Sequence, residues 1–347
     1  MYKLAKIFRT AVQYQASDLF ISTGSKPILR INGDLVKIEE HPVLTKKMAE
    51  EYLLEILTPE QKKQFEQSLD IDLSLDIETI ARFRVNMFVQ RKGISAAFRT
   101  IPENAPTMDE LGLPTQMKRV TTSKNGLVIV TGPSGSGKTT TLASIIGEIN
   151  KNQKKHIITI EDPVEYVHKN DQSIIQQREV GIHTHSFKKA LRASLRENPD
   201  IILVGEMRDL ETMQQAITAA ETGHLVLATL HTTGCAESIN RIIDSFPPDQ
   251  QNQIRAQLST CLKAVFWQTL IKTRDNKGRV GAFEIMFSNN AIANMIRKST
   301  THQINSVIET STKEGMQTMK KSLIDLVQAG IITEEKAMEN MPKEFET

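Results

Sequence analysis

The chain has 347 residues, a formal net charge of +2, and 39% hydrophobic and 24% charged residues. This length predicts about two domains, and the near-neutral charge gives no global field toward nucleic acid or anionic lipid. No apolar run approaches the length of a membrane span, and the N-terminus lacks the apolar core of a signal peptide. Two distant cysteines, Cys235 and Cys261, favour a reduced, cytoplasmic compartment.

The first hundred residues predict an α+β domain with an antiparallel sheet, because short helices alternate with strand-like stretches bounded by turn residues. A turn at Gly33–Asp34 separates two of the strands, and Pro59 opens a helix at its first turn. The predicted helices are 4–15, 45–57 and 59–68. The predicted strands are 18–22, 27–32, 35–38, 70–75, 81–91 and 94–101.

A change of pattern marks the second domain. The stretch Pro102–Gln116 carries three prolines, so we predict a linker at 102–118 between domains at 1–101 and 119–347. Beyond it, apolar runs at 126–130, 156–160, 200–206 and 224–230 alternate with helices, as in an α/β domain with a parallel sheet. From about residue 289 the pattern is helical, with Gly315 and Gly330 as stops.

The segment Gly132–Thr139 matches the phosphate-binding pattern G-x-x-x-x-G-K-[ST]. A predicted strand precedes it and a predicted helix follows, which disfavours a chance match in a glycine-rich turn. Glycines let backbone N–H groups approach phosphate oxygens, and the helix start adds partial positive charge. We expect Lys138 at the β/γ phosphates and the Thr139 hydroxyl on Mg²⁺. The predicted nucleotide-binding residues are Gly132, Ser134, Gly135, Ser136, Gly137, Lys138, Thr139 and Thr140.

Two later predicted strands end in carboxylates. Glu206 follows the strand Ile201–Val204, and Glu161 and Asp162 follow the strand that Pro163 terminates. A carboxylate there can orient or deprotonate an attacking water. One alone could equally cap a helix or pair with a lysine, but two after the same loop favour Mg²⁺ and water handling.

Histidines offer two further candidates. His231 ends the strand 224–230, where ligand crevices of α/β sheets lie, so it is a candidate sensor of the nucleotide state, although a structural hydrogen bond is the commoner role. His183 and His185 resemble a metal pair, but no further ligands accompany them, and a plain loop is favoured.

Arginines mark the predicted strands of the first domain. Arg82 and Arg84 share one face by alternation, and Arg99 ends the next strand. Exposed strand charge and charge neutralisation at a γ-phosphate both suit these positions, and the residues alone leave that choice open.

Four segments follow one another in the order GPSGSGKTT, ITIEDPVEY, DIILVGEMRDLETMQQAITAAETGH and HLVLATLHTTGCAESINRIID. They resemble the Walker A, Asp, Walker B and His boxes of the secretion-type hexameric ATPases, and specifically of the type IV pilus retraction ATPases (PilT-like). Matches from ASDLFIS near the start to GMQTMKKSLIDLVQAGIIT near the end extend the resemblance over nearly the whole chain. Phe20 departs from it, because the family often has histidine there.

The resemblance implies a homohexameric ring whose subunits have an N-terminal PAS-like domain, a C-terminal RecA-like P-loop domain with a helical tail, and ATP between them. It makes Glu206 and Glu161 the catalytic acids, with Asp162 beside them.

The resemblance also gives roles to three arginines. It implies that Arg84 and Arg99 reach the phosphates when the first domain closes, and that Arg279 lies near the subunit boundary. Phosphoryl transfer is catalysed mainly by positioning and charge, so arginines on a moving domain couple hydrolysis to motion, with the linker as hinge.

The implied function is a Mg²⁺-dependent ATPase motor for pilus retraction and twitching motility, at the cytoplasmic face of the inner membrane. Its implied partners are an inner-membrane platform protein (PilC-like) and an accessory PilU-like ATPase, with membrane contact only through a partner and no nucleic acid.

Several alternatives stay open. One is an accessory, PilU-like retraction ATPase, and another is a pilus-assembly or type II secretion ATPase, although those are usually longer and often carry a four-cysteine zinc motif. A RecA-like nucleic-acid translocase belongs to a different class, and the net charge of +2 and 5% aromatic content disfavour it. A non-catalytic, nucleotide-gated scaffold is the last.

Overall fold

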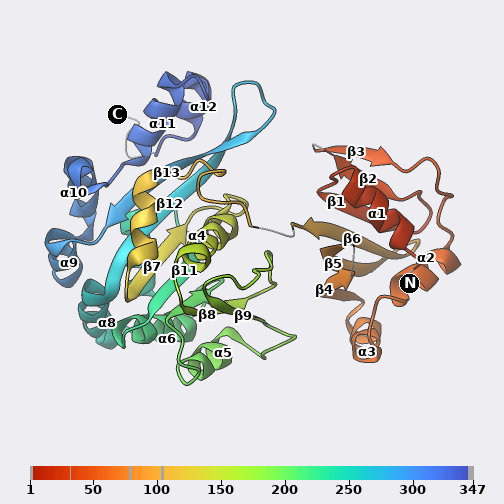
Figure 1. The fold of residues 1–347 in the computed structure, drawn as a ribbon, viewed down its shortest axis with the longest axis horizontal. Coiled ribbons are helices and arrows are strands. Elements are labelled where there is room, and N and C mark those ends of the chain that lie inside the picture. The colour runs from red at the N-terminus through yellow and green to blue at the C-terminus, as the bar shows by residue number, and fades with distance from the viewer. Residues whose placement is uncertain (1–2, 32, 78–79, 103–104, 343–347) are drawn as a thin grey trace. The chain divides into compact units, whose positions relative to one another are not determined.

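The computed structural model describes residues 3–31, 33–77, 80–102 and 105–342. Asn32 of the predicted strand 27–32 and residues 103 and 104 of the predicted linker lie outside the described residues. The chain forms two compact units (Figure 1). One comprises Met1–Asn104 with the short segment Pro163–Val167, and the other comprises Ala105–Asp162 and His168–Thr347. Each unit has its own hydrophobic core.

The first unit is built on a six-stranded antiparallel sheet of order β3-β2-β1-β6-β5-β4, which confirms the predicted α+β class. Phe8 of α1 packs against Phe83 and Phe98 of the sheet, with ring centroids 4.7 and 5.1 Å apart. Pro59 opens α3, as predicted, behind a capping box of Thr58 and Gln61. The helices are α1 (Ala5–Gln13), α2 (Lys46–Leu54) and α3 (Pro59–Ser68), and the strands are β1 (Asp18–Ser22), β2 (Ile28–Ile31), β3 (Asp34–Lys37), β4 (Asp70–Ile77), β5 (Ala81–Gln90) and β6 (Gly93–Ile101).

The second unit contains a seven-stranded sheet of order β13-β12-β7-β11-β10-β8-β9. Every neighbouring pair is parallel except β12 with β13. All residues of β7, β10 and β11 are buried, so both faces of the sheet are covered, as the apolar runs predicted. The strands are β7 (Gly126–Thr131), β8 (His156–Glu161), β9 (Ile174–Glu179), β10 (Ile201–Val204), β11 (Leu225–Leu230), β12 (Leu262–Lys272) and β13 (Arg279–Phe287).

Helices complete the second unit. Asn289 caps α9 through a hydrogen bond from the Ile292 N–H, and Gly315 and Gly330 end helical segments at φ values of 86° and 70°, so the predicted helical tail is confirmed. Within the described residues, no helix has the length and apolar character needed to span a membrane. The α-helices are α4 (Lys138–Asn152), α5 (Phe187–Ser194), α6 (Leu210–Glu221), α7 (Cys235–Asp244), α8 (Pro248–Cys261), α9 (Asn290–Arg297), α10 (Ile304–Thr310), α11 (Met319–Gln328) and α12 (Glu334–Glu339), with 3₁₀ turns at Thr115–Thr122, Thr301–Gln303 and Thr312–Glu314.

Part of the predicted linker belongs to this second core. Met108, Leu113 and Met117 are buried among the strands and helices of the second unit. Side chains packed in this way are fixed to the unit that buries them. The predicted linker is therefore part of the second unit at least from Met108 onward.

The parallel strands bring the predicted site residues to one edge of the sheet. The phosphate-binding loop follows β7, Glu161 ends β8, Glu206 follows β10 and His231 follows β11. Since β8, β10, β11 and β7 are consecutive neighbours, their carboxyl ends lie side by side, where open α/β sheets bind ligands.

Candidate active site

The loop between β7 and α4 has the backbone that phosphate binding requires. Gly132, Gly135 and Gly137 have φ values of 148°, 76° and 86°, a region that residues with a Cβ rarely adopt. At Gly132 an added Cβ would also lie 2.2 Å from the carbonyl oxygen of Gln268 on β12. Glycine at this position thus permits both the loop conformation and the close approach of the neighbouring strand.

Lys138, the first residue of α4, is folded back into this loop. Its side chain is 8% exposed, and its Nζ donates to the carbonyl oxygens of Gly132 and Pro133 at 2.8 and 3.0 Å. The same Nζ lies 3.4 Å from Nδ1 of His231. The ammonium is therefore held against the first residues of the loop, and the sequence analysis predicts the β/γ phosphates beside it.

His231 lies between Lys138 and the Glu206 carboxylate. A lysine ammonium has donors only, so in a hydrogen bond between Lys138 and His231 the ammonium donates and Nδ1 of His231 accepts. Nε2 of the same ring is 3.2 Å from Oε1 of Glu206. These two contacts align Lys138, His231 and Glu206 in one continuous series of polar contacts.

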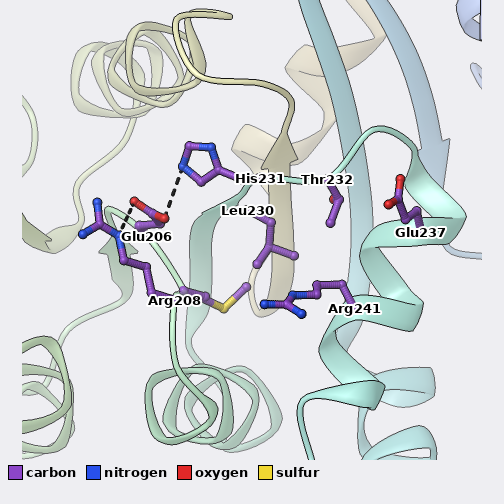
Figure 2. A pocket seen from close by; sticks show the side chains of 8 residues that line it. Glu206, Arg208, Leu230, His231, Thr232, Glu237 and Arg241 are labelled. Atoms are coloured by element: carbon purple, nitrogen blue, oxygen red, sulfur yellow. Dashed lines mark ion pairs between the residues drawn. The ribbon is translucent and has the colours of Figure 1, made fainter.

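Both oxygens of the Glu206 carboxylate have a partner. Oε1 faces His231, and Oε2 pairs with Nε of Arg208 at 2.8 Å. Figure 2 shows His231 and Arg208 both reaching the Glu206 carboxylate. These residues face a pocket of about 420 Å³. A carboxylate held in this way can bind and orient a water next to the phosphate-binding loop. The pocket is lined by Glu206, Met207, Arg208, Leu230, His231, Thr232, Glu237 and Arg241.

Glu161 lies on the neighbouring strand and is nearly buried, at 7% exposure. Its Oε1 accepts from the Thr159 hydroxyl at 2.6 Å and from Nε2 of Gln177 at 3.1 Å. The strands bring it beside the Glu206 segment, since a Cβ on Gly205 would lie 3.3 Å from the Cα of Glu161. Asp162, one residue further, is exposed.

The remaining loop residues differ in exposure. Ser134 and Gly135 are exposed, whereas Thr139 and Thr140 in the first turn of α4 are half-buried. Ser136 is buried, and its hydroxyl makes no hydrogen bond within the described part of the chain. A buried polar atom without a partner is costly, so this hydroxyl suits a site that binds a polar ligand.

The first unit places two of the predicted arginines together. Arg84 on β5 and Arg99 on β6 are directly opposite each other in the antiparallel register. Nε of Arg99 pairs with Oδ1 of Asp18 on β1 at 3.0 Å, although 69% of the Arg99 side chain is exposed. Asp18 also lies 3.5 Å from Nε of Arg30. This face of the sheet therefore carries a row of guanidinium groups around one carboxylate.

Two other candidates lie apart from this chemistry. Arg279 is the exposed first residue of β13 and pairs in register with Lys272. It takes no part in the network of Lys138, His231 and Glu206 described above. His183 Nδ1 accepts from the Glu179 N–H at 3.0 Å, and the described residues contain no group of His, Cys, Asp or Glu that could hold a metal ion.

Two residues of the site were missed by the sequence reasoning. Arg208 stands two positions after Glu206, so its nearness was visible, but an arginine in that position has many possible partners. Gln268 lies 132 positions after Ser136, whose carbonyl it contacts, and no local pattern connects them.

The family model described as type II/IV secretion system protein matches residues 2–339. A type IV pilus retractation ATPase, PilT, of Pseudomonas aeruginosa is 46% identical over 344 residues, which is 99% of each chain. A twitching motility protein of Neisseria gonorrhoeae is 45% identical over 337 residues, covering 97% of this chain and 90% of the relative. Among solved structures, the pilus retraction motor PilT with bound ADP superimposes with a TM-score of 0.93 at 42% identity, over 100% of this chain and 99% of that one.

The close approach at Gly132 gives a first prediction. Gly132→Ala places a Cβ 2.2 Å from the Gln268 carbonyl oxygen, so the loop must shift, and we expect ADP affinity to fall at least about tenfold, or roughly 1.4 kcal/mol. Isothermal titration calorimetry measures the ADP affinity. The control is Gly147→Ala, where an added Cβ meets nothing within 4 Å; this variant keeps its affinity and gains about 0.5–1 kcal/mol of stability as a better helix former. Unchanged ADP binding by Gly132→Ala contradicts the prediction.

Proposed function

The chain belongs to the type II/IV secretion system protein family, and we propose that it is the ATPase motor of this family that powers type IV pilus retraction and twitching motility. Two relatives whose names state these activities support the proposal across nearly the full chain. The structural observation that carries the proposal is the series of polar contacts from Lys138 through His231 to Glu206, which begins at the phosphate-binding loop. This arrangement connects the site of ATP binding to a candidate base.

The residues of the loop suit Mg²⁺-ATP as substrate. Glycines with positive φ leave backbone N–H groups accessible, Lys138 supplies a fixed positive charge, and the partnerless Ser136 hydroxyl offers a further contact. Thr139 would hold Mg²⁺, which neutralises charge on the phosphate oxygens when bound. We assign the eight loop residues from Gly132 to Thr140 named above to the nucleotide site.

Hydrolysis needs a group that orients and deprotonates water. Glu206 fills this role in our proposal, because His231 and Arg208 fix its carboxylate. Glu161 assists from the adjacent strand, with Asp162 beside it. His231 contacts both the lysine and the base, so a change at the phosphates alters the hydrogen bonding of Glu206. This supports its role as the sensor of the nucleotide state.

We further assign residues 1–101 to a PAS-like domain and 119–347 to a RecA-like domain, joined by the linker 102–118. Because Met108, Leu113 and Met117 are packed in the second core, the hinge of that linker lies before Met108. Arg84 and Arg99 are proposed to meet the γ-phosphate as the first domain closes, and Arg279 to act near the subunit boundary.

The assembly in this proposal is a homohexamer at the cytoplasmic face of the inner membrane. It acts on a PilC-like platform protein, with a PilU-like ATPase as accessory partner, and makes no direct contact with nucleic acid. The solved structure of similar fold is a pilus retraction motor with bound ADP, which supports a nucleotide-driven motor of this type.

The direction of pilus movement is tested in cells. In a strain without the gene, we expect excess surface pili that do not retract and a loss of twitching. Complementation with Lys138→Ala leaves this phenotype unchanged, because the variant has lost the loop ammonium, whereas Lys151→Ala, an exposed lysine near the end of the same helix, restores motility. Cells without pili would instead indicate an extension ATPase.

Glu206→Gln separates binding from chemistry. Glutamine keeps the size of the side chain and an acceptor for His231 but loses the base, so Mg²⁺-ATP still binds and turnover stops. Nucleotide binding and steady-state ATPase rate are the measurements. Glu309→Gln changes an exposed carboxylate on α10 that does not line this pocket and leaves turnover near the unmodified rate. If Glu206→Gln binds no nucleotide, Glu206 has a structural role.

Arg84→Ala and Arg99→Ala test the phosphate role of the first unit. Arginine fingers contribute about 10³–10⁵ in rate in related systems, and two arginines that share the task contribute less each. We expect each variant to lower turnover at least about tenfold, or roughly 1.4 kcal/mol of barrier. ADP affinity is expected to change little, because ADP lacks the γ-phosphate, and lysine substitutes poorly without the planar fork.

The control for these variants is Arg91→Ala, an exposed arginine next to the end of β5, which keeps full activity. ATPase rate and ADP affinity are measured on assembled rings. An equal loss of ATP and ADP binding shows that Arg84 and Arg99 hold structure and do not meet the γ-phosphate.

A further inference from the structure

Gln268 on β12 is a buried amide that contacts the phosphate-binding loop at two points. It is 2% exposed, and its Nε2 donates to the Ser136 carbonyl at 2.6 Å. Its Oε1 accepts from the Thr141 hydroxyl at 2.8 Å. Both ends of the amide are therefore paired with the segment that carries Lys138.

The partners fix which end of the amide faces which residue. A backbone carbonyl can only accept, so the NH₂ group must face Ser136, and the carbonyl oxygen of the side chain then receives the Thr141 hydroxyl. Ser136 and Thr141 are themselves 2% exposed. Hydrogen bonds at such depth are not exchanged for water, so each one lost leaves an unpaired polar group.

Packing alone does not explain a glutamine here. The preceding residues of the strand, Val265, Phe266 and Trp267, are buried and apolar, and an apolar side chain of similar length would fill the same space. Burying an amide is unfavourable unless its hydrogen bonds are made. What the amide adds over an apolar residue is its pair of directed contacts with the loop.

Those contacts bracket the functional turn. Ser136 precedes and Thr141 follows the residues Gly137–Thr140, which include Lys138 and Thr139. Because the same amide holds both ends, the span between them is fixed from the neighbouring strand. The Gln268 main chain also lies against Gly132, where a Cβ would come within 2.2 Å of its carbonyl oxygen, so the start of the loop is constrained by the same residue.

We propose that Gln268 is a positioning residue for phosphate binding, which holds the loop from Ser136 to Thr141 in the conformation that receives the diphosphate of the nucleotide. The proposal rests on the proposed nucleotide-binding function of this loop. A loop ordered before the ligand arrives does not have to be ordered by it, so binding is tighter. The effect concerns the phosphates, because both hydrogen bonds of the amide go to the loop and α4.

The test compares ADP with adenosine, which lacks phosphates. Gln268→Met keeps length and apolar volume but removes both hydrogen bonds. We expect its ADP affinity, measured by calorimetry, to fall at least about tenfold, while adenosine affinity, measured by ligand-observed NMR, stays within about twofold. KM for ATP rises accordingly. Gln253→Met, at an exposed glutamine on α8, changes neither affinity.

Thr141→Val gives the second half of a double-mutant cycle. It removes only the hydroxyl that reaches Gln268, so its loss of ADP affinity is smaller, and the double variant loses less than the sum of the two single losses. Additive losses, or an equal fall in ADP and adenosine affinity, overturn the proposal. So does a fall in melting temperature with an unchanged ratio of ADP to adenosine affinity.

Two further outcomes are distinguishable. If Gln268→Met does not fold, Gln268→Glu and Thr141→Val carry the test: the glutamate still accepts from Thr141 but cannot donate to Ser136, and its ADP affinity must fall selectively for the proposal to stand. If the unmodified protein binds no ADP, the proposed function itself is wrong. If it binds ADP and Gln268→Met binds both ligands equally well, only the positioning role is wrong.

Discussion

The parallel hydrogen bonding of β7 to β11 is the constraint on which the site depends. Its register pairs Gly126–Thr131 with Leu225–Leu230 residue by residue, so the phosphate-binding loop and His231 leave the sheet at the same level. β10 and β8 continue the arrangement with Glu206 and Glu161. Because these strands are buried on both faces, a shift by one residue would move each side chain to the opposite, differently packed face and would displace the groups at the sheet edge at the same time.

Charges at this edge are arranged as one unit rather than as separate residues. Lys138, His231, Glu206 and Arg208 form a line of polar contacts in which the His231 ring and the Glu206 carboxylate lie between two cations. In such a network each group is oriented by its neighbours. A phosphate that draws the Lys138 ammonium away from His231 would therefore change the contacts of Glu206 through a single imidazole ring. This gives a physical route from nucleotide contact to the residue that we propose as the water-activating group.

The sequence predicts those parts of the site that local patterns mark, and it misses contacts between residues that are far apart along the chain. The loop, Glu161, Glu206 and His231 were predictable because each stands at the end of an apolar run. β12 was not predicted, since Leu262 continues directly from α8 without a turn residue, and the edge strand β9 has too few buried apolar residues to form a run. Gln268 was missed with β12, because its partners are fixed only when that strand lies beside β7.

The arginine row of the first unit has no explanation in the stability of its sheet. Like charges directly opposite in an antiparallel pair are destabilising, yet Arg84 and Arg99 are opposite each other, and Asp18 lies within 4 Å of Nε of both Arg99 and Arg30. The other carboxylates of this face lie on β4, where Asp76 is opposite Arg82 but the uncharged Ser74 is opposite Arg84. Exposed ion pairs contribute little to folding, so the pairing with Asp18 does not offset the repulsion by much. The opposite placement of Arg84 and Arg99 therefore disfavours folding slightly. It suits a role in binding an anion, because their guanidinium groups are planar hydrogen-bond donors on one face of the sheet. This is the role that we propose for Arg84 and Arg99 in the motor.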